Sequence, residues 1–360
     1  MPFERSTYHH GARRPAVSFL PSAAILELTY QCNHRCVFCS CPWGVTGVEG
    51  ETVSELTTEE WKSAIKKLCE MGVSNITFSG GEPLLRQDLM ELISYSSSCS
   101  VEHIDTLNSA LVSRYDSPNL YIITNGRDVN DQFMQVCKRH NVKLGISLPG
   151  LETFQNHTGY DGAEKVLEVL SQAKKLGVET VANITVTKLN IHELERIIAS
   201  ALLAGAGQIL LNRFLPGGQG LAHKEELILS PDQVAEMVNV GETVLRAANR
   251  FGALGTIVPA CLVNPCSYEN LTVSTECSAA TKFFTVGPSG YVRVCNHSSE
   301  DLAHIDRIQD LKRSEHWKAF SLKGYLPEGC GGCPDKISCD GGCPEVGDDS
   351  ARYSSSKYRQ

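Results

Sequence analysis

The amino-acid sequence predicts an α/β fold: a partial, TIM-like (β/α)6 barrel followed by a small, irregular, cysteine-rich domain. Two observations support this prediction. Between residues 24 and 250, short apolar segments alternate with amphipathic ones, a pattern typical of parallel strands covered by helices. After residue 250, helical periodicity is lost and cysteines become frequent, which indicates a region held together by metal. We therefore expect an arm over 1–23, the barrel over 24–250, the cysteine-rich domain over 251–345 and a disordered tail over 346–360.

Six segments have the short, β-branched or aromatic character of strands, and glycine or polar residues follow most of them. The expected strands are 25–30, 75–79, 120–124, 143–148, 181–186 and 208–214. Helical periodicity and end signals mark the segments between them. Thr57 and Glu60 form a capping-box signature before the first helix, and Pro231 begins the last one. The expected helices are 58–71, 88–95, 131–140, 163–176, 191–203 and 230–250.

Composition argues against several classes of function. The chain is 42% hydrophobic and 21% charged, as expected for a globular protein with a sizeable core. Its formal net charge is −8 and it has no Lys/Arg-rich run, so we expect no nucleic-acid partner. No apolar stretch is long enough to span a bilayer and no signal-peptide pattern opens the chain, so we expect a cytoplasmic protein without membrane contact. In such a chain, 15 cysteines indicate metal binding rather than disulfides.

Three of these thiols lie close together just after the first expected strand: Cys32, Cys36 and Cys39. Thiolates are the usual ligands of iron–sulfur clusters, and a 4Fe–4S cluster normally takes four. Three thiols on one loop therefore suggest a cluster with one iron left open, as chemistry on a bound molecule requires. A structural zinc site is the alternative, although it usually has paired CxxC motifs.

A second motif, Gly80-Gly81-Glu82-Pro83, follows the second expected strand roughly forty residues later. With the CxxxCxxC spacing, and with an aromatic residue before the third cysteine, this sequence resembles the radical S-adenosylmethionine (SAM) enzymes. The resemblance implies that the three cysteines bind a 4Fe–4S cluster whose open iron binds S-adenosyl-L-methionine. It also implies reductive cleavage of SAM to a 5′-deoxyadenosyl radical, which abstracts a hydrogen from the substrate.

The resemblance also implies contacts to SAM. The motif from Gly80 to Pro83 would lie at the SAM amino group, because glycines allow close backbone approach and the Glu82 carboxylate can accept from an ammonium. Phe38 would lie near the adenine; its alternative is a core aromatic.

Later strand ends provide further candidates for SAM contacts. Ser147 would lie near the ribose, and Asn183 and Arg213 follow on later strands, where Arg213 could pair with the SAM carboxylate. Each of the three could instead be a structural polar residue. Many relatives have Ser-Leu-Asp-Gly where this chain has Ser-Leu-Pro-Gly over 147–150, so no role is carried over from that aspartate.

Two cysteine patterns occupy the region after residue 250. They are Cys277-x12-Gly290-x4-Cys295 and Cys330-x2-Cys333-x5-Cys339-x3-Cys343. Together they resemble the SPASM extension of radical SAM enzymes, an iron–sulfur domain that holds two auxiliary 4Fe–4S clusters. A zinc ribbon would explain the pair Cys330 and Cys333 but not the whole set.

The resemblance implies a ligand set for each auxiliary cluster. One set contains Cys277, Cys295, Cys343 and either Cys261 or Cys266. The other contains Cys330, Cys333, Cys339 and a later cysteine, which this sequence lacks. The thiols suffice for two clusters if Cys261 and Cys266 are both ligands. Otherwise the distal cluster has an open iron or a non-thiolate ligand, for which the candidates are Asp340, Asp348 and Asp349.

The remaining features have simpler interpretations. Cys69 and Cys137 fall in helical patterns and are expected to pack as small apolar side chains. Cys41 is not expected to be a ligand despite its closeness to Cys39. The glycine-rich loop 216–220 follows a barrel strand, and we expect it to contact substrate.

Within the SPASM group, the common theme is oxidation or cross-linking of residues in a ribosomally synthesised precursor peptide, and this is the leading hypothesis. The alternatives are a small-molecule radical SAM dehydrogenase, formylglycine formation of the sulfatase-maturase type, and peptide epimerisation. A non-catalytic electron carrier or zinc scaffold would leave the Gly80–Pro83 motif without a role. A flavodoxin or ferredoxin is the expected reductant. Because only ~23 residues precede the first expected strand, a separate leader-recognition protein is a further possible partner.

Overall fold

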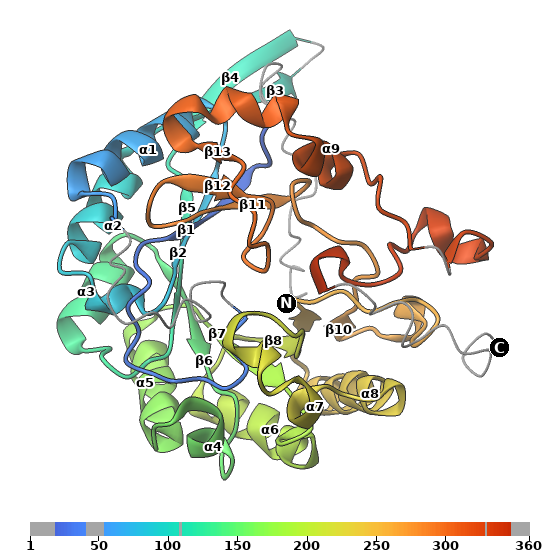
Figure 1. Ribbon diagram of the computed structural model, residues 1–360. Helices are drawn as coiled ribbons and strands as arrows, with labels where there is room; N and C mark the ends of the chain where they lie inside the picture. The colour runs from blue at the N-terminus through green and yellow to red at the C-terminus, as the bar shows by residue number, and fades with distance from the viewer. Residues whose placement is uncertain (1–18, 41–53, 108–109, 328–329, 347–360) are drawn as a thin grey trace.

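The computed structural model of the protein describes residues 19–40, 54–107, 110–327 and 330–346. Over these residues, one curved sheet of eleven strands forms the centre of the molecule (Figure 1). Its strands are ordered β10-β9-β8-β7-β6-β5-β2-β1-β11-β12-β13. Every neighbouring pair from β10 to β11 is parallel, whereas β12 is antiparallel to both its neighbours. The predicted α/β partial barrel is therefore confirmed.

The six predicted strands form the continuous middle of this sheet. They are β1 (Ala23–Glu27), β2 (Asn75–Ser79), β5 (Asn119–Thr124), β6 (Lys143–Ser147), β7 (Thr180–Val186) and β8 (Gln208–Arg213). The limits predicted for the first strand, 25–30, were wrong, because β1 begins at Ala23 and ends at Glu27. Beyond that point the backbone N–H of Leu28 still donates to Ser79, and the chain then leaves the sheet toward Cys32.

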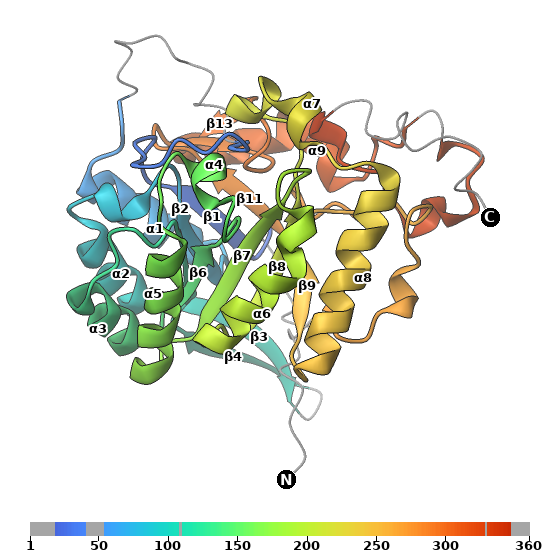
Figure 2. The same cartoon turned by 90° about the horizontal axis from the view of Figure 1, so that it is seen from below.

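Helices cover the outer face of the sheet in both views (Figures 1 and 2). The long ones are α1 (Thr58–Glu70), α2 (Leu89–Ser98), α3 (Asp131–Arg139), α5 (Ala163–Leu176), α6 (Leu194–Ala204) and α8 (Pro231–Ala247). The capping box of Thr57 and Glu60 is present as predicted. The helix expected over 191–203 begins instead as a 3-10 turn, Ile191–Glu193, at which Asn190 makes no side-chain cap. Three short helices complete the set: α4 (Phe154–Thr158), α7 (Lys224–Leu227) and α9 (Glu315–Ser321).

The two faces of the strands have different roles. On β6, Leu144 and Ile146 are fully buried on one face, whereas Lys143 and Ser147 alternate with them and are half-buried on the other. Gly145 lies on this second face, where a Cβ atom would collide with the hydroxyl of Tyr121 and the amide of Asn183. These polar side chains therefore pack directly over the backbone on the inner face of the barrel.

The region after residue 250 adds strands to both edges of the same sheet. β9 (Gly252–Leu254) and β10 (Leu271–Thr272) extend it beyond β8. β11 (Phe283–Val286), β12 (Tyr291–Arg293) and β13 (Ala303–His304) extend it beyond β1. The sequence did not predict these strands, because segments of two to four residues carry too little periodicity to recognise.

A hairpin of β3 (Val101–Leu107) and β4 (Ala110–Asp116) was also not predicted. It projects from the end of the barrel opposite to the loop that follows β1 (Figure 2). The limits of the arm, the barrel, the cysteine-rich domain and the tail stay predictions, and residues 1–18 and 347–360 lie outside the described residues. No helix in the described part of the chain is both long and apolar enough to cross a membrane.

Candidate functional site

The loop carrying Cys32, Cys36 and Cys39, called the cluster loop from here on, lies at the carboxyl ends of the barrel strands. Proteins with α/β folds place their sites at these ends. The N–H of Cys39 donates to the carbonyl of Cys36 at 3.1 Å, and the N–H of His34 donates to the Cys32 sulfur at 3.4 Å. Burial raises the pKa of the Cys36 thiol, and Cys39 and Cys32 raise it further because like charges would meet. Three thiols so close together can ionise together only beside a cation, and this fits an iron–sulfur cluster.

The glycine pair of the second motif is joined to the base of this loop. The N–H of Gly81 donates to the Thr29 carbonyl at 2.8 Å, and the N–H of Glu82 donates to the Gln31 carbonyl at 2.7 Å. Gly80 has a φ of +130°, and a Cβ atom on Gly81 would collide with the Gln31 carbonyl. Glycine is therefore required here by the approach of the cluster loop itself.

The carboxylate of Glu82 is buried and fully engaged by the protein. It accepts from the backbone of Leu84 at 3.0 Å, the hydroxyl of Thr124 at 2.8 Å and the backbone of Asn125 at 2.7 Å. Burial raises its pKa to about 7, although these hydrogen bonds oppose the shift. Pro83, also buried, begins the 3-10 turn Pro83–Leu85. The motif thus links the end of β2 to the end of β5.

The loop after β5 contacts one side of the cluster loop through Asn33. The amide of Asn125 donates to the Asn33 side-chain oxygen at 2.6 Å, and the guanidinium of Arg127 donates to the Asn33 carbonyl at 2.9 Å. The Asn33 amide donates in turn to Asp128 at 2.7 Å. Asn33 is therefore held through every polar part of its side chain, a role that no sequence motif indicated.

Helix α4 and the glycine-rich loop contact the other side. The N–H groups of Arg35 and Val37 donate to the carbonyls of Thr158 and His157 at 2.8 and 2.9 Å. The N–H of Gly220 donates to the Cys39 carbonyl at 3.1 Å. The loop 216–220 therefore packs on the cluster loop; its predicted contact with substrate stays a prediction.

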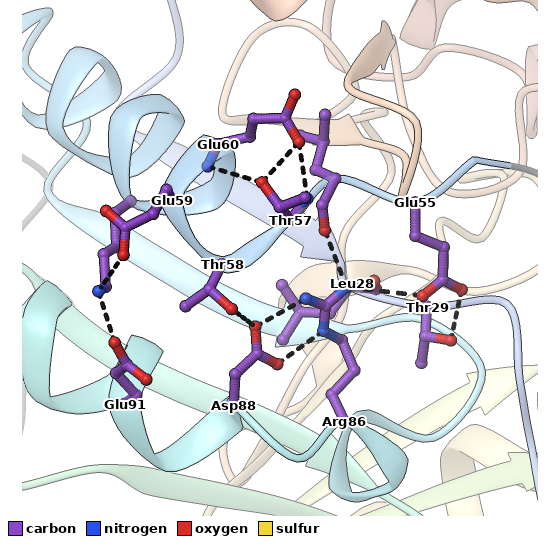
Figure 3. Close-up of polar contacts among 12 residues, drawn as sticks. Leu28, Thr29, Glu55, Thr57, Thr58, Glu59, Glu60, Arg86, Asp88 and Glu91 are labelled. Atoms are coloured by element: carbon purple, nitrogen blue, oxygen red, sulfur yellow. Dashed lines mark hydrogen bonds and ion pairs between the residues drawn. The ribbon is translucent and has the colours of Figure 1, made fainter.

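A network of charges joins the chain just before the cluster loop to the segments around residues 55 and 86 (Figure 3). Arg86 forms a two-point ion pair with Asp88, at 2.8 and 2.7 Å, and also donates to the carbonyls of Leu28 and Leu56, each at 3.1 Å. Because of Arg86, the pKa of Asp88 lies below its usual value. This network ties residues 28 and 56 to the turn that follows the glycine motif.

Glu55 extends the same network to the first residues of the loop. One of its carboxylate oxygens accepts from the hydroxyl of Thr29 at 2.6 Å and from the backbone N–H of Tyr30 at 3.1 Å, as Figure 3 shows for Thr29. Glu55 also lies 3.5 Å from Arg86. The backbone that leads into Cys32 is therefore fixed by side chains from a different part of the chain.

The predicted SAM contacts occupy different surroundings. Ser147 and Asn183 are register partners on neighbouring strands and share the inner face of the barrel. Arg213 is fully buried on the same face of β8 as Ile209 and Leu211. Its Nε donates to the Ile257 carbonyl at 2.9 Å. The ring of Phe38 is half-buried and lies 5.7 Å from that of His157. The structure brings Ser147 and Asn183 together and places Arg213 apart from them.

A buried ion pair joins the first barrel strand to the cysteine-rich region. Glu27 on β1 and Arg293 on β12 contact each other, and their side chains are 1% and 2% exposed. Arg293 also donates to the Ser298 carbonyl at 2.8 Å. Burial raises the pKa of Glu27 to about 7, whereas Arg293 lowers it. This pair had no signal in the sequence, because its partners are far apart along the chain.

The cysteines after residue 250 fall into two groups. Burial raises the pKa of the Cys261 thiol, and it is raised further by Cys339, Cys330 and Cys333. Burial also raises the pKa of Cys295, with contributions from Cys343 and Cys277. Cys266 lies on the turn Pro265–Ser267 and, like Cys261, is exposed.

Within the described residues, no three His, Cys, Asp or Glu side chains converge as they would on a single metal ion. A 4Fe–4S cluster is larger, with each thiolate bound to a different iron, so its ligands need not converge on one point. Cys69 and Cys137 are buried in the core, as expected. Cys41, Asp348 and Asp349 lie outside the described residues.

Asp340 has a role that the sequence did not indicate. Its Oδ2 atom accepts from the backbone N–H of Cys277 at 2.6 Å, from Nζ of Lys323 at 2.6 Å and from the hydroxyl of Tyr325 at 3.2 Å. The Tyr325 hydroxyl also hydrogen-bonds to the Cys277 thiol. The carboxylate therefore organises the surroundings of Cys277.

Comparison with known proteins agrees with this geometry. Residues 26–201 match the model of the radical SAM superfamily. The chain therefore carries a radical SAM domain, and the radical SAM family binds SAM and a 4Fe–4S cluster.

Particular relatives cover most of the chain. The PqqA peptide cyclase of Xanthomonas campestris pv. campestris (strain 8004) is 27% identical over 332 residues, covering 90% of this chain and 82% of that protein. The PqqA peptide cyclase of Bradyrhizobium diazoefficiens is 24% identical over 339 residues, covering 90% and 81%.

Two solved structures share the fold. Streptococcus suis SuiB bound to SAM superposes with a TM-score of 0.67 at 13% identity, covering 91% of this chain and 76% of SuiB. The enzyme anSMEcpe with bound SAM and the peptide Cp18Cys superposes with a TM-score of 0.67 at 18% identity, covering 91% and 90%.

Proposed function

We propose that this radical SAM enzyme oxidises or cross-links residues of a ribosomally synthesised precursor peptide. The carrying observation is the joining of the three-thiol loop to the Gly80–Pro83 turn at the carboxyl end of the barrel, with a second group of thiols in the same molecule. The names of the sequence relatives support a peptide substrate, since each is a PqqA peptide cyclase.

In this proposal, the chain's own residues would bind the cluster and SAM, orient them and shield them from water. Cys32, Cys36 and Cys39 hold a 4Fe–4S cluster, and when bound, that cluster and SAM supply the hydrogen-abstracting radical chemistry. Asn33 and the network of Arg86 and Glu55 keep the loop rigid, so that the thiols stay in place without reorganisation. Ser147 and Asn183 present polar groups on the inner face of the barrel, where SAM would extend.

The thiols after residue 250 would hold two auxiliary clusters. Oxidation of a peptide releases electrons as well as protons, and clusters in the same chain offer a route for those electrons to leave. A flavodoxin or ferredoxin would supply the electron that starts each turnover. A separate leader-recognition protein would present the peptide, and the reaction would take place in the cytoplasm.

Mass spectrometry after anaerobic co-expression with a precursor peptide encoded beside this gene tests the proposal. The expected result is 5′-deoxyadenosine release and the loss of two hydrogen atoms from the peptide. The control is the Cys32→Ala/Cys36→Ala/Cys39→Ala variant, which should leave the peptide unchanged. Deuterium uptake at an α-carbon without mass loss would indicate epimerisation, and no reaction with any peptide would favour a small-molecule substrate.

A further inference from the structure

The thiols Cys330, Cys333 and Cys339 form an incomplete set by sequence, because no cysteine follows Cys343. We infer that Cys261, on the turn after β9, is the fourth thiol ligand of this distal site. The inference rests on the proposed function only in that the site holds an iron–sulfur cluster. It implies that the other site retains three thiols, Cys277, Cys295 and Cys343, with Cys266 outside both.

Backbone contacts place the Cys261 turn against the distal thiols. The N–H of Ala260 donates to the Cys339 sulfur at 3.4 Å, and the N–H of Gly341 donates to the same sulfur at 3.4 Å. A Cβ atom on Gly341 would lie only 2.8 Å from the Cys330 sulfur. Ala260, which directly precedes Cys261, and Gly341, which lies beside the Cys330 sulfur, therefore both donate to the Cys339 sulfur.

The alternative ligand Asp340 is turned away from the distal site. Its Oδ2 atom accepts three hydrogen bonds around Cys277, which belongs to the other set. The backbone also fixes this orientation, because the N–H of Asp340 donates to the Thr275 carbonyl at 3.0 Å. Cys339 and Asp340 are adjacent in sequence and serve different thiol sets.

Cys266 provides a matched control in the same segment. Both cysteines are exposed. Cys266 lies on the turn Pro265–Ser267, where its backbone N–H donates to Asn264 at 3.1 Å. The two cysteines are five positions apart, so substitution of either one tests the same chemistry with similar risk to folding. A site with four protein thiols is closed, whereas one with three leaves a position open to another ligand.

The test is iron and sulfide quantitation with electron paramagnetic resonance (EPR) on the full chain, reconstituted anaerobically. Cys261→Ala should lose the iron of one cluster and one EPR signal, whereas Cys266→Ala should retain both. Cys330→Ala should lose the same signal, and the double variant Cys261→Ala/Cys330→Ala should lose no more, because both thiols serve one cluster. Cys295→Ala should lose a different signal.

Retention of all iron in Cys261→Ala would overturn the inference, as would loss from Cys266→Ala. Additive losses in the double variant, or loss of the signal that Cys295→Ala abolishes, would also overturn it. Circular dichroism identifies any variant that fails to fold, and Cys261→Val, which also lacks a donor atom, then replaces it with the same expectations. Peptide modification is measured separately, so failure of the proposed function leaves these readouts intact.

Discussion

The Tyr325 hydroxyl hydrogen-bonds to the Cys277 sulfur, whereas Nζ of Lys323 donates to the Cys277 carbonyl at 2.5 Å. Asp340 accepts from both residues. Burial raises the pKa of the Cys277 thiol, but the charge of Lys323 and the hydroxyl of Tyr325 lower it. Lys323 adopts a φ of 59°, a conformation that is rare for a residue with a side chain. Donors aimed at a ligating sulfur stabilise the more negative, reduced form of a cluster and so raise its reduction potential.

We therefore expect Tyr325→Phe to lower the reduction potential of the auxiliary cluster proposed at Cys277. Loss of one neutral hydrogen bond corresponds to a shift of about 20–60 mV for one electron. Potentiometric titration followed by EPR measures it. Tyr115→Phe removes a hydroxyl from an exposed tyrosine on β4 and should leave the potential unchanged. A positive shift in Tyr325→Phe would contradict the expectation.

Helix α4 is only five residues long and has no side-chain cap, yet two of its carbonyls support the cluster loop. The turn that precedes it is held by Glu193, the N-cap residue of α6. The Glu193 carboxylate accepts from the backbone N–H groups of residues 151, 152 and 153 at 3.2, 3.0 and 3.2 Å. The cluster loop is therefore supported indirectly by a carboxylate that is 1% exposed.

Glu193→Gln should weaken this support in a pH-dependent way. Burial opposes ionisation, but the hydrogen bonds from Thr153 and the backbone prevail and lower the pKa of Glu193. A lowered pKa stabilises the folded state above the unfolded pKa, near 4.3, and this stability is lost as pH falls through the folded value. We expect a loss of about 1–3 kcal/mol in unfolding free energy at pH 7, shrinking below about pH 4.

Urea unfolding followed by tryptophan fluorescence at both pH values measures this effect. Glu195→Gln, at an exposed position on α6, is the control and should change little. A deficit in Glu193→Gln that grows on acidification would show that the carboxylate is not the stabilising form.

Elements with local signals were predicted closely from the sequence. β2 and α5 have the predicted limits, and α5 ends at Gly177 with a φ of +73°, as glycine permits. The cysteine loop and the glycine motif were recognisable for the same reason, since their spacing is local. Arg86, Glu55 and Cys261 act through contacts between distant segments, which no local pattern encodes.

The pair of Glu27 and Arg293 is a fully buried link between the barrel and the cysteine-rich region. It joins β1 to β12 across β11, beside the loop that carries Cys39. Neither charge can reach water, so each depends on the other. Neither residue belongs to a motif, although both are among the largest or most polar groups in the core.

Removing one partner of this pair should lower the unfolding free energy strongly. Removing the second partner as well should add less than its own single loss. We expect Glu27→Gln or Arg293→Met to lower the unfolding free energy by about 3–5 kcal/mol, since one buried charge is left alone. The double variant should lose clearly less than the sum. Denaturant unfolding measures all three, and Asp116→Asn, which breaks an exposed pair with Arg114, should cost about 1 kcal/mol or less. Strict additivity would contradict the coupling.

The continuous sheet also limits how such enzymes could exchange parts. Strands from the thiol-rich end pair with β8 through β9 and with β1 through β11. A chimera cut at residue 250 would expose two unpaired strand edges, each a template for aggregation. Any foreign electron-transfer module grafted onto this barrel must therefore bring matching strands for both edges, so the barrel and its thiol-rich end are best inherited, and engineered, as one piece.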